Sequence, residues 1–261
     1  MKHLLTPDEM RAVKFYEGDI PACDRDDPFW GDARAYVTLN ALLYDDLATE
    51  YTRVREGKTL NPEMLRDLPR LRNLYAALFS AARKGVQSRS RTGYRVERAA
   101  DFAVCLQKGM TCAFTSMSLD GFLTAYGDKQ DIVLLVYQVP AGTPLMIFSE
   151  LLDSYGKAGE NEMLLPPFLR FDAQELPLNG AALTITDLNG APPKAAYEIT
   201  VRPTEKTAPV SDDPALPEVY PAVCRLYGQI GALLPETELD PDDRAAYLQC
   251  KQAIRQYIQA L

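Results

Sequence analysis

The chain of 261 residues contains one histidine, His3, which stands close to the first residue of the sequence. A Ser-His-Asp triad, a Cys-His dyad and a zinc site built on several histidines each need a histidine placed within the site. The composition therefore excludes these three kinds of chemistry. Catalysis by this chain would have to use carboxylates, hydroxyls and arginines.

Cysteines are few and widely spread along the chain. They form no C-x-x-C pair, and their odd number argues against a complete disulfide framework. The acidic residues are not clustered at ligand spacing and no histidine accompanies them, so the sequence predicts no metal site. The five cysteines are Cys23, Cys105, Cys112, Cys224 and Cys250.

The sequence also lacks a long apolar run and an excess of basic residues. No run is long enough to cross a bilayer, so we expect no membrane partner. The net charge of −8 and the pI of about 4.9 disfavour nucleic acid as a partner. Near the start, Pro7, Asp8 and Glu9 interrupt the apolar core that a classical secretory signal needs. We therefore expect a cytoplasmic location or delivery by a specialised secretion route.

The first ninety residues carry helical signals. Residues 6–9 read as a capping box with proline at the first helical position. Apolar periodicity predicts a second helix over 31–56 and a third over 61–85, which Pro69 should kink or break. The apolar stripe of the third helix could be a partner-binding groove or a face packed in the core, and the second interpretation is the more common.

From Arg91 onward, short strand-like runs alternate with Gly, Asp and Pro. A continuous apolar and β-branched run predicts a buried strand over 132–137. Residues 204–217 are rich in Pro, Asp, Thr and Ala and are interpreted as a linker. The mixture of elements indicates an α+β fold. Further strands are predicted over 145–148, 163–165 and 196–201, and further helices over 120–126, 218–234 and 241–261.

Glu160 and Glu162 are separated by one residue and run directly into the apolar stretch Met163–Leu165. On a strand their side chains would point the same way, about 7 Å apart along the backbone. Two like charges at that separation repel each other. The pair is therefore kept either because both carboxylates are solvated or because a site needs them.

Two upstream stretches hold residues that suit such a pair. Ser116 and Ser118 stand two positions apart, which places both hydroxyls on one face of a strand. Tyr94 and Arg95 lie in a short β-prone run further upstream. Each stretch also has a structural interpretation, as strand-face hydroxyls and as a surface arginine.

An arginine, then Ser-x-Ser, then Glu-x-Glu followed by Leu-Leu-Pro, in that order over about seventy residues, resembles the R-S-E class of mono-ADP-ribosyltransferases. This class includes bacterial toxins and effectors, and the resemblance covers roughly residues 90–203. It implies an ADP-ribosyltransferase-like split β-sandwich core with a cleft for NAD and with flanking N- and C-terminal helices. We expect an N-terminal helical lobe (1–90), the core (91–203), a linker (204–217) and a C-terminal helical extension (218–261).

The resemblance also implies roles for single residues. Glu162 matches the catalytic glutamate, and Glu160 matches the residue that engages an arginine acceptor. Arg95 matches the arginine that grips the phosphates and ribose of NAD, and Ser116 matches the serine that orients the glutamate. Tyr155 matches an aromatic residue used in substrate recognition, with a loop-packing tyrosine as an equal alternative.

Tyr94 and Ser118 complete the residues expected to bind NAD, which would be a substrate. The sequence departs from the family pattern where Val96 follows Arg95 in place of a frequent glycine, and where Met117 separates the two serines. The expected activity is transfer of ADP-ribose from NAD to an arginine of a protein target. Alternatives are NAD glycohydrolysis, a non-arginine acceptor on the same fold, or a non-catalytic helical interaction module with solvated glutamates.

Overall fold

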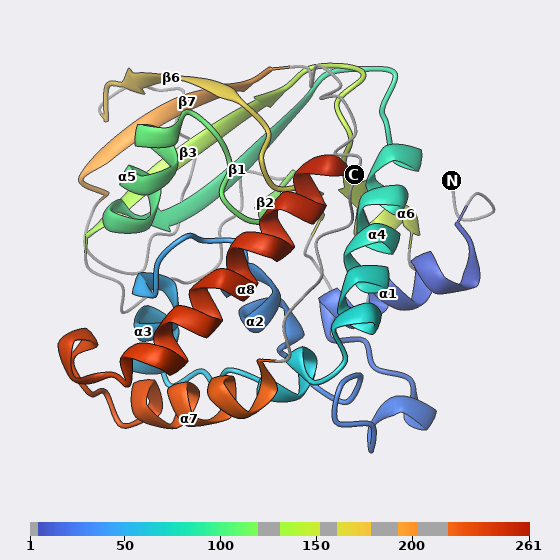
Figure 1. Cartoon of the computed structure of the whole chain (residues 1–261). Helices are drawn as coiled ribbons and strands as arrows, with labels where there is room; N and C mark the ends of the chain where they lie inside the picture. The colour runs from blue at the N-terminus through green and yellow to red at the C-terminus, as the bar shows by residue number, and fades with distance from the viewer. Residues whose placement is uncertain (1–4, 120–130, 152–160, 179–192, 203–218) are drawn as a thin grey trace. The chain divides into compact units, whose positions relative to one another are not determined.

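The computed structural model describes residues 5–119, 131–151, 161–178, 193–202 and 219–261 (Figure 1). The chain divides into two compact units. The helical unit comprises Leu5–Ala81 and Lys206–Leu261, and the sheet unit comprises Met1–Leu4 and Ala82–Glu205. Helices that precede the sheet in the sequence and helices that follow it therefore belong to the same unit.

The first helix of the helical unit has the ends that the sequence predicts. α1 (Pro7–Glu17) begins after Thr6, whose hydroxyl accepts a hydrogen bond from the Glu9 amide. The Glu9 carboxylate in turn accepts from the Thr6 amide at 2.6 Å. Gly18 ends the helix with φ of 77°, a left-handed conformation that glycine adopts without strain. The predicted capping box is confirmed.

The single helix predicted over 31–56 is wrong. Two helices lie there, α2 (Ala35–Ala41) and α3 (Ala48–Arg55). The Asp46 carboxylate accepts from the Ala48 amide at 3.1 Å, a local bond that competes with the helical backbone pattern. The apolar period runs through the break without change, which is why the sequence pattern did not reveal it.

Pro69 marks a real interruption. A 3₁₀ turn, η3 (Pro62–Leu65), precedes the long helix α4 (Leu68–Lys84). Pro69 thus falls in the first turn of α4, where a missing amide hydrogen costs no helical hydrogen bond. The Asp67 carboxylate supports this start by accepting from the Arg70 amide at 3.0 Å.

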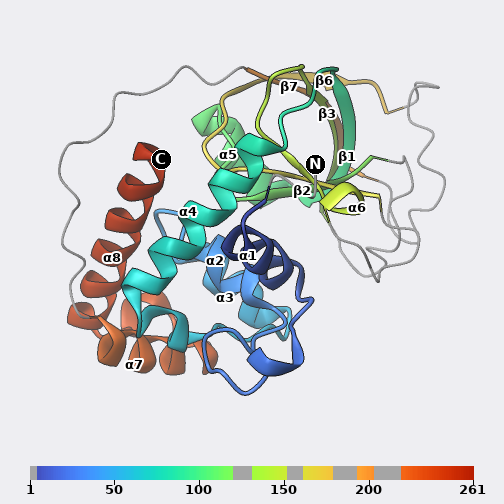
Figure 2. The ribbon, with the colours of Figure 1, turned by 90° about the vertical axis from the view of Figure 1, so that its right-hand side faces the viewer.

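Two helices follow the sheet unit in the sequence, as predicted. α7 (Tyr220–Gly231) packs against α8 (Pro241–Ala260), α3 and η3 (Figure 2). Asp240 caps α8, since its carboxylate accepts from the amides of the second and third helical residues. The predicted linker 204–217 and the predicted helix 120–126 lie outside the described residues.

A buried polar network joins α3, α7 and α8. The ammonium of Lys251, 1% exposed, lies 2.6 Å from Oε1 of Glu50, which is 0% exposed. The Tyr247 hydroxyl donates to the same oxygen at 2.9 Å, and the Tyr227 hydroxyl lies 2.8 Å from that of Tyr247. Burial raises the pKa of the Glu50 carboxyl, and the charge of Lys251 opposes that rise.

Within the described residues, the sheet unit is built on seven strands in the order β4-β5-β2-β1-β3-β7-β6. Figure 1 labels β1, β2, β3, β6 and β7 of this sheet. Neighbouring strands are antiparallel except β3 and β7, which are parallel. Phe102 of α5 (Ala99–Lys108) packs in a buried core with side chains from most of the strands. The strands are β1 (Arg91–Arg98), β2 (Thr115–Ser118), β3 (Ile132–Val139), β4 (Met146–Ile147), β5 (Glu162–Leu165), β6 (Phe171–Leu176) and β7 (Ala195–Val201).

The ladder between β1 and β2 has the fewest residue pairs of any ladder in the described sheet. β1 pairs with β3 over all its residues, but its ladder with β2 has one pair, Tyr94 with Ser118. At Gly93, a Cβ atom would lie 2.3 Å from Sδ of Met117 and 2.8 Å from Cε of Met163. A larger residue at position 93 would require the side chains of Met117 and Met163 to move.

The strands predicted over 132–137, 163–165 and 196–201 correspond to β3, β5 and β7. Only Met146 and Ile147 form a strand in the predicted 145–148, because Phe148 begins the short helix α6 (Phe148–Leu151). The α+β fold class is confirmed. No described helix is both long enough and apolar enough to span a membrane.

Three elements of the sheet unit were not predicted, α5, α6 and β6. The β6 sequence lacks β-branched residues and four of its six side chains are exposed, so it carries no strong strand pattern. It forms one edge of the sheet, and the two-residue β4 forms the other. α5 directly follows β1 with no turn residue to mark the change.

Candidate active site

Three neighbouring strands carry the predicted arginine, the serines and one of the two glutamates. β1 holds Tyr94 and Arg95, β2 holds Ser116 and Ser118, and β5 begins at Glu162. Ser118 lies directly opposite Tyr94 on one side and Glu162 on the other. Opposite residues of antiparallel strands share a face, so these three side chains project from one face, and alternation adds Ser116.

The Ser116 hydroxyl donates a hydrogen bond to Oε1 of Glu162. The bond runs diagonally across the β2–β5 ladder, because the residue opposite Ser116 is Leu164. Both side chains are half-buried. A hydroxyl donor orients one carboxylate oxygen without itself adding a positive charge.

Arg95 is held by two acceptors of the protein itself. Its Nη1 donates to the backbone oxygen of Ser116 at 2.7 Å, and its Nε donates to Oε2 of Glu97 at 2.7 Å. Its Nη2 forms an ion pair with the same Glu97 oxygen. The arginine therefore fixes the backbone of the residue whose hydroxyl holds Glu162.

Glu97 was not found by reasoning from the sequence. It follows Arg95 by two positions on β1, so both side chains project from the same face of the strand. The spacing Arg-x-Glu on a predicted strand was the available signal. Nearly four-fifths of each side chain is buried, with exposures of 20% for Arg95 and 19% for Glu97.

The pKa values of one thiol and one tyrosine near this pair are raised. A hydrogen bond with the Cys112 thiol, together with burial, raises the pKa of Cys105. Burial also raises the pKa of Tyr137, which the charge of Arg95 opposes. A thiol is nucleophilic as its thiolate, so a raised pKa keeps Cys105 inert.

Two predicted site residues, Glu160 and Tyr155, lie outside the described residues. Tyr94 and Ser118 lie next to each other across the β1–β2 pair and are half-buried. Among the residues that the structure describes, no three His, Cys, Asp or Glu side chains group so as to hold a metal ion.

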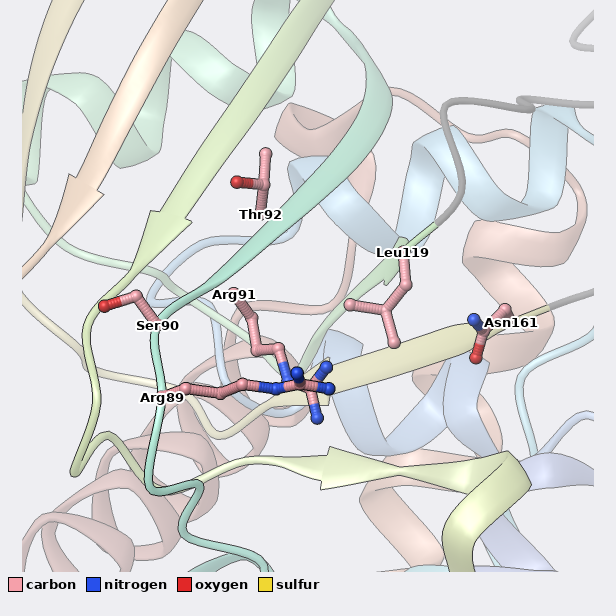
Figure 3. A pocket seen from close by; sticks show the side chains of 6 residues that line it. All are labelled: Arg89, Ser90, Arg91, Thr92, Leu119 and Asn161. Atoms are coloured by element: carbon pink, nitrogen blue, oxygen red, sulfur yellow. The ribbon is translucent and has the colours of Figure 1, made fainter.

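A cavity of about 450 Å³ opens where β1 begins, β2 ends and β5 begins (Figure 3). Its wall includes Asn161, the residue directly before Glu162 in the sequence. Two arginines also line it, and neither was among the predicted site residues. The lining residues are Arg89, Ser90, Arg91, Thr92, Leu119 and Asn161.

No protein-family model and no curated protein sequence matches the chain. Among solved structures it is similar to BECa, the ADP-ribosylating toxin of a binary enterotoxin of C. perfringens with NADH, at 14% identity and a TM-score of 0.47. That match covers 77% of this chain and 45% of BECa, so this chain spans less than half of the BECa chain.

Two further solved structures are similar to this chain. Plx2a, an ADP-ribosyltransferase toxin from Paenibacillus larvae, matches at 15% identity and a TM-score of 0.43, over 77% of this chain and 89% of Plx2a. The catalytic domain of VahC from Aeromonas hydrophila matches at 17% identity and a TM-score of 0.45, over 76% and 100%. BECa and Plx2a are ADP-ribosylating proteins, the class that the sequence motifs resemble.

Proposed function

We propose that the sheet unit is a mono-ADP-ribosyltransferase that transfers ADP-ribose from NAD to an arginine side chain of a protein and releases nicotinamide. The observation that carries the proposal is the hydrogen bond from the Ser116 hydroxyl to Glu162, with Arg95 bonded to the Ser116 backbone. Arginine, serine and glutamate come from three strands, are far apart in the sequence and lie in one connected set of contacts.

The chemistry of NAD cleavage matches this arrangement. Breaking the nicotinamide–ribose bond passes through an oxocarbenium-like state, as at other glycosidic centres. Nicotinamide leaves as a neutral group, so no general acid is required, and negative charge near the developing cation lowers the barrier. In the proposal Glu162 supplies this charge and accepts a hydrogen bond from the ribose 2′-hydroxyl. Ser116 holds its carboxylate in place.

The arginine acceptor is the more specific part of the proposal. It rests on Glu160, which is assigned by resemblance and lies outside the described residues. A carboxylate can hold a guanidinium through two parallel hydrogen bonds and can polarise the attacking nitrogen. Without such a residue, water would be the competing acceptor and the product would be free ADP-ribose.

The division of the chain belongs to the proposal as well. We propose that residues 91–203 hold the NAD site and that the helices outside them take no part in NAD cleavage. The helical lobe 1–90 and the extension 218–261 would then affect stability or the choice of target. The target of the transferase would be a protein, which it would reach in the cytoplasm or after delivery by a specialised secretion route.

The test compares nicotinamide release with and without agmatine, an arginine mimic, for the parent and for Glu160→Gln. We expect the parent to release nicotinamide and to modify agmatine, and the variant to lose modification while keeping much of the NAD hydrolysis. Glu175→Gln is the matched control, because Glu175 is an exposed glutamate on the edge strand β6.

Each outcome decides between the candidate functions. If the parent hydrolyses NAD and never modifies agmatine, the arginine acceptor is wrong and NAD glycohydrolysis or another acceptor replaces it. If the parent neither binds nor cleaves NAD, the transferase proposal fails and a non-catalytic module remains. Equal loss of both activities in the Glu160 variant would remove that residue from the acceptor role.

A further inference from the structure

Glu97 of β1 is a carboxylate beside the candidate site that has no direct task in the proposed reaction. Its Oε2 accepts from Nε of Arg95 at 2.7 Å and also from Nη2 of that arginine. Its Oε1 accepts from the backbone amide of Arg98 at 3.3 Å. Both oxygens are therefore bonded, and the carboxylate that holds the arginine is itself tied to the backbone of the next residue.

The backbones of β1 and β2 separate at the place where Arg95 reaches across. The two strands are antiparallel, and their ladder has one pair, Tyr94 with Ser118. In the same register Val96 would stand opposite Ser116, but the ladder ends before that pair. The Ser116 carbonyl instead accepts from Nη1 of Arg95 at 2.7 Å. A side chain of β1 thus supplies a bond to β2 where the backbone ladder has ended.

The carboxylate of Glu97 sets the direction in which this arginine points. Arginine is a long side chain, and holding it in one geometry costs conformational entropy. Glu97 binds the edge of the guanidinium formed by Nε and Nη2, and Nη1 is then turned toward β2. Without that acceptor, a guanidinium that is 20% exposed would lose its counter-charge, which favours a rotamer nearer to water.

We propose that Glu97 is a positioning residue of the candidate site, which directs the Arg95 guanidinium onto the backbone of Ser116. Because the Ser116 hydroxyl donates to Glu162, the position of β2 sets the orientation of that carboxylate. Glu97 acts through Arg95 and Ser116 and touches neither NAD nor the bond that breaks. The reaction that this arrangement serves rests on the proposed function.

The first measurement follows β2 itself and needs no activity. Amide hydrogen exchange over residues 112–119 is compared by mass spectrometry for the full-chain parent, Glu97→Ala and Glu97→Gln. We expect exchange in this segment to become roughly tenfold faster in Glu97→Ala, since a lost hydrogen bond to a charged group loosens β2. Glu97→Gln keeps one acceptor oxygen, so its exchange should lie between those of the alanine variant and the parent.

Glu198→Gln is the matched control for both measurements. Glu198 is a half-buried glutamate of β7 in the same sheet, and its Oε2 accepts from the side-chain amide of Gln138 at 3.1 Å. It makes no part of the contacts that join β1 to β2. Exchange over residues 112–119 and the rate of nicotinamide release should stay at the parent values in this control.

The second measurement is the steady-state rate of nicotinamide release from NAD. A residue that orients the catalytic carboxylate should lower kcat, by about tenfold in Glu97→Ala, and leave the KM for NAD nearly unchanged. Glu97→Gln should recover part of kcat. If Glu97 instead competed with NAD for Arg95, its removal would lower KM and leave kcat unchanged, and the inference would be wrong.

Failure of this inference can be told apart from failure of the transferase proposal. If neither Glu97 variant exchanges faster than the parent over residues 112–119, the inference is wrong, whatever the nicotinamide assay shows. If exchange becomes faster but the parent releases no nicotinamide, Glu97 keeps its role in holding β2 and the transferase proposal falls. If the parent cleaves NAD and both variants keep its kcat, the positioning role is wrong. Glu97→Gln decides the result if Glu97→Ala does not fold, because glutamine keeps the shape of the side chain.

Discussion

Each unit of this protein contains a glutamate that other side chains of the chain hold in place, and the chemistry of those side chains differs between the two units. Glu50 of the helical unit is fully buried and is held by the ammonium of Lys251 and the hydroxyl of Tyr247. Glu162 of the sheet unit is half-buried and accepts from the hydroxyl of Ser116.

The difference shows how surroundings set the task of the same side chain. A carboxylate taken wholly out of water needs a counter-charge, and the pair then serves to join helices. In the proposed function the carboxylate of Glu162 must be oriented toward a developing cation, and the hydroxyl of Ser116 contributes to that orientation. The contrast predicts that changes at Glu50 act on folding and that changes at Glu162 act on chemistry.

The largest effect should follow from removal of the buried counter-charge. Lys251→Met would leave the Glu50 carboxylate buried without its cation, which should cost about 3–5 kcal/mol of unfolding free energy. Urea denaturation measures this loss. The double change Glu50→Leu with Lys251→Met should recover most of the loss, because it removes both charges.

The pH dependence of the Lys251→Met variant has a definite sign. Burial raises the pKa of Glu50 above its ordinary value of 4.5, so the folded state binds a proton that the unfolded state has released. The deficit of the variant should therefore grow as pH rises from about 4.5 through the raised pKa of the folded state, and it should level off above that pKa. A deficit with no dependence on pH would show that Glu50 is not the buried charge responsible.

The next effect concerns chemistry at Glu162. Glu162→Gln keeps the shape but removes the negative charge, so the rate of nicotinamide release should fall by roughly 10²–10³. The unfolding midpoint should stay near that of the parent. Full activity in this variant would show that Glu162 is not catalytic. The contrast with Glu50 would then be wrong as well.

Loss of the orienting hydroxyl should be milder. Ser116→Ala removes one hydrogen bond to a carboxylate, and we expect kcat to fall about tenfold with little change in the KM for NAD. Ser116→Thr, which keeps a hydroxyl, should restore part of the rate. An equal loss in the alanine and threonine variants would point to packing rather than to orientation.

The smallest effect lies at the far end of the buried network. Tyr227→Phe deletes the hydroxyl that meets Tyr247 and keeps the ring, so it should cost about 1 kcal/mol of unfolding free energy. Nicotinamide release per folded molecule should be unchanged. A measurable loss of NAD cleavage in the fully folded variant would contradict the contrast, because a change in the helical unit would then affect chemistry in the sheet unit.

Much of the fold could be predicted because local signals and tertiary structure agree. The capping box of α1, the buried strand β3 and the helix α8 all follow from patterns within a few residues. The break between α2 and α3 could not be predicted, because Asp46 redirects the backbone while the apolar period continues. The edge strand β6 could not be predicted either, because its own sequence carries no strong strand pattern and it is a strand through its pairing with β7.

The site was predictable to the extent that its residues follow a motif. Ser116 and Glu162 were singled out from spacing and resemblance, and the structure joins them by a hydrogen bond. Glu97 was not assigned, because the Arg-x-Glu spacing was its only signal and its importance comes from the ion pair with Arg95. The cavity at Arg89 and Arg91 depends on three strand ends meeting, which no single stretch of sequence encodes.

The two edges of the sheet have a consequence for behaviour at high concentration. An open strand edge is a template for pairing with another chain, and proteins limit this with short edge strands and charged side chains. β4 is two residues long, and on β6 the carboxylate of Asp172 is 59% exposed and paired with Arg202. Both edges are thus poor templates for strand addition. We expect the folded chain to resist aggregation by strand addition at these two edges.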